Sequence, residues 1–145
     1  MLLFGSSVRG FSSSSNSLIS RPWPRSSLIS SSKNNLNIIQ NWVSDSHWAD
    51  FLCEDVNNLS STSICLKLVD PKIIDLPLEI KNKIEKNITK LLEEYKVAFD
   101  IGSYRSAPPG LRIWGGPTVE NDDVKNLLPW LDWAYFKTLD QLEIK

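Results

Sequence analysis

The sequence predicts an α+β fold, in which a short antiparallel or mixed sheet is covered by helices on one face. Three observations predict it: a long amphipathic helix over about 77–99, short apolar strands at 63–69 and 111–114, and a second helical period from 121 onward. With 145 residues, of which 41% are hydrophobic, the chain is long and apolar enough for one domain with a buried core.

Orderly structure is expected to begin with a short helix that ends near Val43. Apolar residues from Leu36 to Val43 recur at roughly helical spacing, and Ser31 or Ser32 is available to cap the helix. A compact apolar patch follows over residues 48–53. The sequence therefore predicts that this helix and patch contribute to the core.

The first expected strand covers residues 63–69, after a loop over 57–62 that is rich in Asn and Ser. The strand is mostly apolar on both faces and stops at Asp70-Pro71, because proline cannot donate to a ladder. Lys67 in this strand is a candidate for a lysine that forms a Schiff base. A lysine at a strand edge, with its ammonium group in water, is the more frequent situation.

The clearest helix runs from Pro77 to about Phe99. Proline suits the first turn of a helix, and Asp75 lies close enough to cap it. Charged residues, Glu85 among them, cover one face, which is expected to be solvated. The apolar stripe predicted to be buried consists of Ile80, Ile84, Ile88, Leu91, Leu92 and Tyr95.

Residues 101–110 form an expected loop, stiffened by glycine and proline, before the strand at 111–114. Thr118 is a candidate cap for the last helix, and residues 121–123 place further caps and negative charge at its start. Pro129 falls inside this helix. Its predicted buried stripe consists of Val124, Leu127, Leu128, Leu131, Tyr135 and Leu139.

The charge and the cysteine pattern exclude several classes of function. A net charge of −1 argues against a general nucleic-acid binder, and no apolar run is long enough to span a bilayer. His47 is the only histidine and no C-x-x-C pair occurs, so a structural zinc site is excluded and a structural histidine is expected. Cys53 and Cys65 are expected to be buried free thiols in a reducing compartment.

Residues 1–27 are expected to be a disordered, serine-rich segment ahead of a domain over residues 28–140. The segment contains arginines but no acidic residue, and the first acid in the chain is Asp45. Two interpretations remain open: an organelle transit peptide, which has this composition, or a disordered or misread stretch upstream of the domain. A secretory signal is disfavoured, because the apolar start over residues 1–4 is too short.

The strongest candidate site is a pair of arginines, Arg105 and Arg112, separated by a loop of prolines and glycine. A guanidinium binds a carboxylate or phosphate through two parallel hydrogen bonds, so the pair would suit a small dianionic ligand. Gly110, between them, would let the backbone approach a ligand closely. The alternative from the pattern alone is that Arg105 is a solvated loop residue and Arg112 a charge on an edge strand.

Longer motifs in the chain resemble one enzyme family, the phosphoserine aminotransferases, in the form found in alphaproteobacteria and some archaea, within the class V aminotransferases. The similar stretches are residues 104–114, Gly116, 118–120 and 127–134, together with 48–52, 61–67 and 69–71. The resemblance covers roughly residues 28–136 and is to the C-terminal end of the family. One departure, a Gly-Gly-Pro turn at 115–117 in place of a Cys-Gly-Ala-like turn, touches no expected ligand contact.

The resemblance implies the small C-terminal domain of a fold type I enzyme that uses pyridoxal 5′-phosphate. The implied reaction is reversible amino transfer between glutamate and 3-phosphohydroxypyruvate, which gives phosphoserine for serine biosynthesis. Because the chain resembles the small domain alone, the lysine that carries the cofactor is expected to be absent, and the chain alone is expected to be inactive. The complete enzyme would be a homodimer in the cytoplasm, or in an organelle if residues 1–27 are a transit peptide.

By position in the family motif, Arg112 matches the arginine expected to hold the substrate α-carboxylate. Arg105 lies where related enzymes place an arginine for the phosphate or the distal carboxylate. Both would position the amino acid without breaking bonds, so no catalytic residue, cofactor-binding residue or metal ligand is expected in this chain. The preference between phosphoserine and 4-phosphohydroxythreonine stays open. The alternative function is a non-catalytic anion-binding or interaction domain derived from a truncated aminotransferase.

Overall fold

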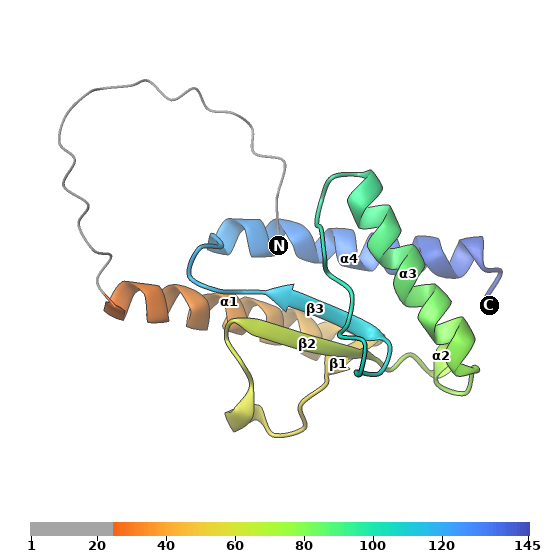
Figure 1. Cartoon of the computed structure of the whole chain (residues 1–145), viewed down its shortest axis with the longest axis horizontal. Helices are drawn as coiled ribbons and strands as arrows, with labels where there is room; N and C mark the ends of the chain where they lie inside the picture. The colour runs from red at the N-terminus through yellow and green to blue at the C-terminus, as the bar shows by residue number, and fades with distance from the viewer. Residues whose placement is uncertain (1–24) are drawn as a thin grey trace.

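The computed structural model describes residues 25–145 and has the predicted α+β architecture (Figure 1). The elements, in chain order, are α1 (Arg25–Asp45), β1 (Ala49–Phe51), η1 (Val56–Asn58), β2 (Ser63–Leu68), α2 (Pro71–Ile74), α3 (Leu78–Glu94), β3 (Gly110–Trp114) and α4 (Asn121–Gln141). Across the described residues, each helix is too short or too polar to cross a membrane.

The three strands form an antiparallel sheet in the order β1-β2-β3. Side chains alternate along a strand, so the paired residues of β2 and β3 divide into two faces. The buried face carries Ile64, Leu66, Leu111 and Ile113, and the outer face carries Ser63, Cys65, Lys67, Arg112 and Trp114. The expectation that residues 63–69 are apolar on both faces is therefore wrong. Lys67 lies on the central strand and not at a sheet edge.

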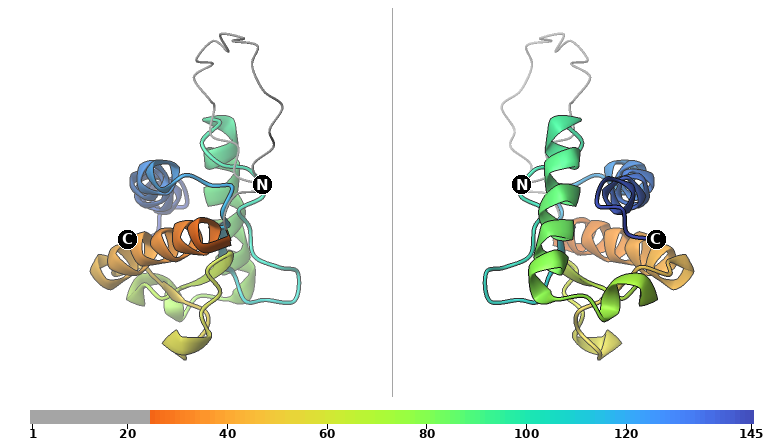
Figure 2. Two further views of the ribbon diagram at one scale, coloured as in Figure 1. Left: turned by 90° about the vertical axis from the view of Figure 1, so that its left-hand side faces the viewer. Right: turned by 90° about the vertical axis from the view of Figure 1, so that its right-hand side faces the viewer.

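α1 and α4 lie on one side of the sheet, and the loop that leads into β3 projects from the opposite side (Figure 2). α4 packs against both α1 and α3, so it joins the two halves of the helical layer. The core between this layer and the sheet includes Trp48 and Tyr135, whose rings stack at 4.3 Å. The helices thus cover the apolar face of the sheet, as predicted, and the outer face keeps its polar side chains accessible.

α1 begins at Arg25, earlier than the expected cap at Ser31 or Ser32. Ser32 is buried inside the helix, where its hydroxyl donates to the carbonyl four residues earlier at 3.3 Å, so the predicted cap is wrong. The domain boundary expected at residue 28 falls inside this helix. Residues 1–24 lie outside the described part of the chain, so the expected disorder of that segment stays a prediction.

α3 ends at Glu94 and not near Phe99, because Lys96 adopts a left-handed conformation with a φ of 56°. Pro77 precedes the helix without a side-chain cap, and Asp75 instead ends α2, so the predicted cap is wrong. Four residues of the predicted stripe are buried: Ile84, Ile88, Leu91 and Leu92. Ile80 is partly buried, and Tyr95 does not belong to the stripe, because its side chain is 56% exposed. Tyr95, at the end of α3, instead lies against the rings of Trp130 and Trp133 on α4, at 5.8 and 4.9 Å.

α4 confirms the most detailed of the helix predictions. All six residues of its expected stripe are buried, and Pro129 lies inside the helix as expected. The N-cap position belongs to Glu120, without a side-chain hydrogen bond, so Thr118 is not the cap.

Three short elements, β1, η1 and α2, were not predicted from the sequence. Asp70 begins α2 by accepting a hydrogen bond from the Lys72 backbone N–H at 2.8 Å. Its other carboxylate oxygen accepts from the hydroxyl of Tyr135 on α4, also at 2.8 Å, although Asp70 is only 3% exposed. Burial and the neighbouring Asp70 carboxylate raise the pKa of Tyr135. A single buried aspartate therefore connects the end of β2, α2 and α4.

Candidate functional site

Arg112 lies in the middle of β3, on the outer face of the sheet, opposite Cys65 of β2. Leu111 and Ile113 on either side of it point into the core, so strand alternation directs the Arg112 side chain outward. Its side chain is 26% exposed, and its backbone N–H donates to the Ile101 carbonyl at 2.8 Å. Arg112 is therefore a fixed arginine that a ligand can reach from solvent.

Two side chains, those of Asp100 and Tyr104, hold the guanidinium of Arg112. Its Nη2 donates to Asp100 Oδ2 at 2.9 Å. The carbon at the centre of the guanidinium lies 4.5 Å from the centre of the Tyr104 ring, a stacking distance for a cation and an aromatic face. The Tyr104 hydroxyl in turn lies 3.3 Å from the Ser63 hydroxyl on β2. These contacts form a small polar site on the outer face.

The same contacts shift the ionisation of Tyr104 and Arg112. The hydrogen bond with Ser63, followed by the interaction with Arg112, holds the pKa of Tyr104 below its ordinary value. The side-chain interaction with Tyr104, and then the charge of Asp100, raise the pKa of Arg112. Arg112 therefore keeps its positive charge at every physiological pH.

Glu85 of α3 fixes both ends of the loop that contains Tyr104. One carboxylate oxygen accepts from the backbone N–H and the hydroxyl of Ser103, both at 2.8 Å, and the other accepts from the Gly110 N–H at 3.2 Å. Hydrogen bonds to a charged acceptor are the stronger kind. The expectation that Glu85 belongs to a solvated face is therefore wrong, because its half-buried carboxylate anchors the loop.

Gly110 is required by the packing of two strands, although its position between the two arginines suggested close approach of a ligand. A Cβ at this position would lie 2.0 Å from the carbonyl oxygen of Leu66, the neighbouring backbone of β2. The close approach that requires glycine is thus between two strands of the sheet. The interpretation of Gly110 as a point of close approach to a ligand is not supported by this contact.

Arg105 is exposed in the turn that follows Tyr104. Within residues 25–145, the structure gives no side-chain hydrogen bond or ion pair of Arg105. Its position fits a solvated loop residue in this chain. A role for Arg105 in binding phosphate stays a prediction.

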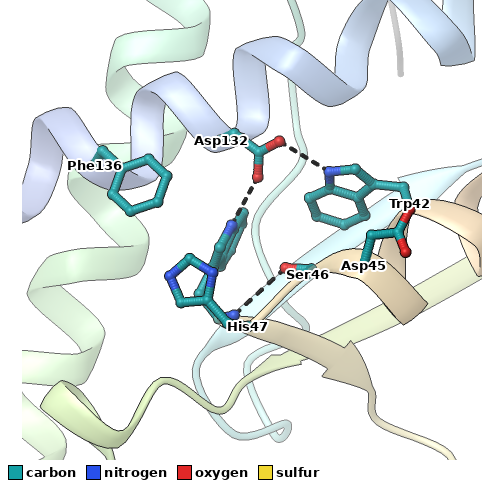
Figure 3. Close-up of a pocket in the computed structure, with 7 residues that line it drawn as sticks. Trp42, Asp45, Ser46, His47, Asp132 and Phe136 are labelled. Carbon is teal, nitrogen blue, oxygen red and sulfur yellow. Dashed lines mark hydrogen bonds between the residues drawn. The ribbon is translucent and has the colours of Figure 1, made fainter.

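A second polar cluster lies on the helical side of the molecule (Figure 3). Asp132 of α4 accepts hydrogen bonds from the indole N–H groups of Trp42 at 3.0 Å and Trp48 at 2.8 Å. They line a hollow of about 270 Å³, with His47 and Phe136 at its side. Asp132 thereby ties α4 to α1 and to the start of β1, which is a structural role.

In the described part of the chain, the surroundings of His47 and of the two cysteines do not indicate a catalytic or metal-binding role. His47 is 65% exposed and lies 4.0 Å from the buried Asp70 carboxylate, as an exposed structural histidine would. Cys53 is exposed and Cys65 half-buried, so the expectation of two buried thiols is wrong. Within residues 25–145, three or more potential metal ligands do not gather at any point.

None of the protein-family models matches the chain. Phosphoserine aminotransferases from Methanosarcina barkeri and Methanosarcina mazei are 42% and 41% identical to it over 108 residues. This chain is homologous to phosphoserine aminotransferases over that segment. The segment is 74% of the chain but 26% of each relative, so the chain spans about a quarter of the length of the relatives it matches. The resemblance inferred from the motifs is confirmed, and the partial coverage fits a C-terminal segment.

A solved structure gives the same family name. Phosphoserine aminotransferase from Bacillus circulans subsp. alkalophilus aligns with 74% of this chain and 26% of its own length, with a TM-score of 0.57. At 18% identity this likeness concerns the fold alone. The predicted fold class, a small α+β domain of the type found in phosphoserine aminotransferase, is confirmed.

The described residues do not form a site for the cofactor implied by the family. Pyridoxal 5′-phosphate is carried by a lysine that reaches it from an enclosed position. Every lysine in the described part of the chain is exposed except Lys67 and Lys81. Lys67 pairs with Asp50 at 3.6 Å across the outer face, and Lys81 donates to the Ile74 carbonyl. The described lysines therefore do not fit the role of the cofactor-carrying lysine.

Proposed function

We propose that this chain is the small domain of a phosphoserine aminotransferase and that Arg112 binds the α-carboxylate of its amino-acid substrates. The observation that carries the proposal is the placement of Arg112 on the accessible face of a sheet, in a chain of which 108 residues are about 40% identical to such enzymes. The complete enzyme would transfer an amino group between glutamate and 3-phosphohydroxypyruvate. In a reducing cytoplasm, the free thiols of Cys53 and Cys65 would remain as they are.

The chemistry assigned to Arg112 is binding and orientation. A guanidinium can donate two parallel hydrogen bonds to a carboxylate, which fixes both the position and the plane of that group. Fixing the α-carboxylate would orient the amino group of the substrate toward the rest of the enzyme, which lowers the entropic part of the barrier. Arg105, exposed in the adjoining loop, would contact the phosphate or the distal carboxylate.

The lysine that carries the cofactor would lie in the part of the family's sequence that this chain does not span. That part would also bind the cofactor, and the complete enzyme would be a homodimer. The support is the coverage of 26% of each relative, together with the exposure of the described lysines. On this proposal the chain without that part is inactive as a transaminase.

A chimeric enzyme tests the proposal. The homologous segment of the Methanosarcina barkeri enzyme is replaced by the 108 matched residues of this chain, and transamination is measured in both directions. We expect an active chimera. Arg112→Lys keeps the charge but loses the second parallel hydrogen bond, so kcat/KM should fall about ten- to a hundredfold for glutamate and phosphoserine alike.

Two controls accompany that measurement. Lys90→Arg, on the exposed face of α3, should leave both rates unchanged. Arg105→Lys should affect the two substrates unequally, because only phosphoserine carries a phosphate. A folded chimera with no activity, or an Arg112→Lys chimera with normal kcat/KM, would instead favour a non-catalytic anion-binding or interaction domain.

A further inference from the structure

The guanidinium of Arg112 already holds a carboxylate, that of Asp100 from the same chain. Nη2 of Arg112 lies 2.9 Å from Asp100 Oδ2 and 3.4 Å from the Asp100 backbone carbonyl. A single guanidinium nitrogen makes both contacts. The arrangement is therefore a one-point contact and not the two-point pairing that a guanidinium forms with its preferred partners.

The side chains of the two partners of this ion pair differ in their exposure to solvent. The Asp100 side chain is 74% exposed and belongs to the segment between α3 and β3. The Arg112 side chain is 26% exposed and projects from a hydrogen-bonded strand. Ion pairs with an exposed partner contribute little to stability, so a competing carboxylate can displace Asp100 at small cost.

Tyr104 holds the guanidinium from the other side. Its ring lies against Arg112 at 4.5 Å, and its hydroxyl is near Ser63 of β2. The loop that carries Tyr104 is anchored at Ser103 and Gly110 by Glu85. The guanidinium would thus stay in place when Asp100 leaves, because the contact with the ring does not involve Asp100.

We propose that Asp100 is an internal stand-in for the substrate carboxylate, which occupies Arg112 until a carboxylate ligand displaces it, and that Tyr104 is the positioning residue that keeps the guanidinium in place during the exchange. This inference rests on the proposed role of Arg112 as the carboxylate-binding residue. Its consequence is competition: Asp100 lowers the apparent affinity for every carboxylate ligand by the fraction of time it occupies Arg112. Ligands that do not use Arg112 should be affected less.

The experiment measures binding to the purified 145-residue chain at low ionic strength. The probes are O-phospho-L-serine and O-phosphoethanolamine, which differ by the carboxylate alone, and binding is followed by the NMR signals of the arginine side-chain N–H groups. Asp100→Asn should tighten phosphoserine binding about two- to fivefold, the range expected for removing one exposed ion pair. Phosphoethanolamine binding should change by less than half as much.

Asp122→Asn is the matched control, because it removes one exposed carboxylate, and thus the same net charge, from the start of α4. It should leave the ratio of the two affinities at the wild-type value. An Asp100→Asn chain with an unchanged ratio, or an Asp122→Asn chain with the same gain, would overturn the role of Asp100.

Two substitutions of Tyr104 test its positioning role. Tyr104→Phe keeps the ring and should retain at least half of the wild-type affinity for phosphoserine, whereas Tyr104→Leu removes the ring and should weaken it about three- to tenfold. Equal effects of Phe and Leu would contradict positioning by the ring. Thermal melts of both variants check that the chain stays folded.

Arg112→Lys separates a failure of this inference from a failure of the proposed function. If wild-type chain does not distinguish phosphoserine from phosphoethanolamine, or if Arg112→Lys distinguishes them equally well, Arg112 does not recognise the carboxylate and both proposals fall. If Arg112→Lys loses the distinction while Asp100→Asn leaves the affinities unchanged, only the stand-in role of Asp100 is wrong.

Discussion

The carboxylate of Asp132 accepts a hydrogen bond of 2.8 Å from the indole N–H of Trp48, across 84 positions of sequence. The other oxygen of the same carboxylate accepts from Trp42 at 3.0 Å. Trp42 belongs to α1 and Asp132 to α4, and Figure 3 shows these two side chains facing each other, while Trp48 directly precedes β1. Two motifs that carry the family resemblance, at residues 48–52 and 127–134, are thus joined by a structural contact and not by a ligand.

Asp132→Asn should destabilise the domain by about 1–3 kcal/mol. Asparagine keeps one acceptor oxygen, but its NH₂ group would face an indole N–H that loses its partner. Urea unfolding followed by tryptophan fluorescence measures the change. Asp140→Asn, on an exposed turn of the same helix, should change stability by less than about 0.5 kcal/mol. Equal stability of the two variants would show that the indole contacts are not needed.

Gly110→Ala should destabilise the domain by at least about 2 kcal/mol. The new Cβ would lie 2.0 Å from the Leu66 carbonyl oxygen, so β2 and β3 would have to separate. Gly102→Ala is the control, because its Cβ would meet Glu85 Oε1 at 3.3 Å and Thr89 Cγ2 at 3.6 Å, which are side-chain atoms. Chemical unfolding of both variants should therefore give a much smaller effect for Gly102→Ala.

Tyr135 should make the domain sensitive to alkaline pH. Burial and Asp70 raise its pKa in the folded state, so this contribution is fully present below the unfolded value of about 10 and is lost as the pH rises above it. Between those two pKa values, the unfolding free energy should fall by about 1.4 kcal/mol per pH unit from this residue. Tyr135→Phe should show a shallower decline above pH 10 in urea titrations. Identical slopes would contradict the buried hydroxyl.

The isolated chain should not retain pyridoxal 5′-phosphate on a single lysine. The described lysines are exposed or paired, and none is enclosed in a way that would favour one of them over the others. After incubation with the cofactor and borohydride reduction, peptide mass mapping should find scattered, substoichiometric labelling. Stoichiometric labelling of one residue together with transaminase turnover would contradict this expectation.

Residues 1–24 should be dispensable for folding of the remainder. This prediction rests on their serine-rich, acid-free composition, which offers too little apolar surface to compensate the entropy of ordering. A chain that begins at Arg25 should have the same melting temperature as the full chain within about 2 °C. A marked loss of stability, or strong protection of that segment in hydrogen exchange, would contradict it.

Local periodicity was enough to predict the elements that bury a regular stripe. The six positions of α4 follow directly from spacing, because burial on one face imposes that spacing, whereas the strands at 63–69 and 111–114 were predicted from short apolar runs. Helix ends were less predictable. The start of α1, the cap of α3 and the exposure of Tyr95 depend on contacts with other parts of the chain or on one left-handed residue, Lys96.

The candidate site divides in the same way. Arg112 was found from the sequence because a family motif marks it, and its outward direction follows from alternation along β3. Its partners were not found. Asp100 and Tyr104 lie 12 and 8 positions earlier, in a loop without periodicity, and Glu85 sits beside the buried stripe of α3 among charges that do face water.

The sequence by itself therefore determined the α+β class, the buried stripe of α4, most of that of α3, and the family resemblance that marks Arg112. Only the tertiary structure decided which polar groups meet: Asp132 with two indoles, Asp70 with Tyr135, Glu85 with the loop, and Asp100 with Arg112. The physical reason is the distance along the chain between the groups that interact. Apolar burial repeats along the chain with the period of the element, whereas a hydrogen bond depends on where two distant segments come to lie after the core has packed.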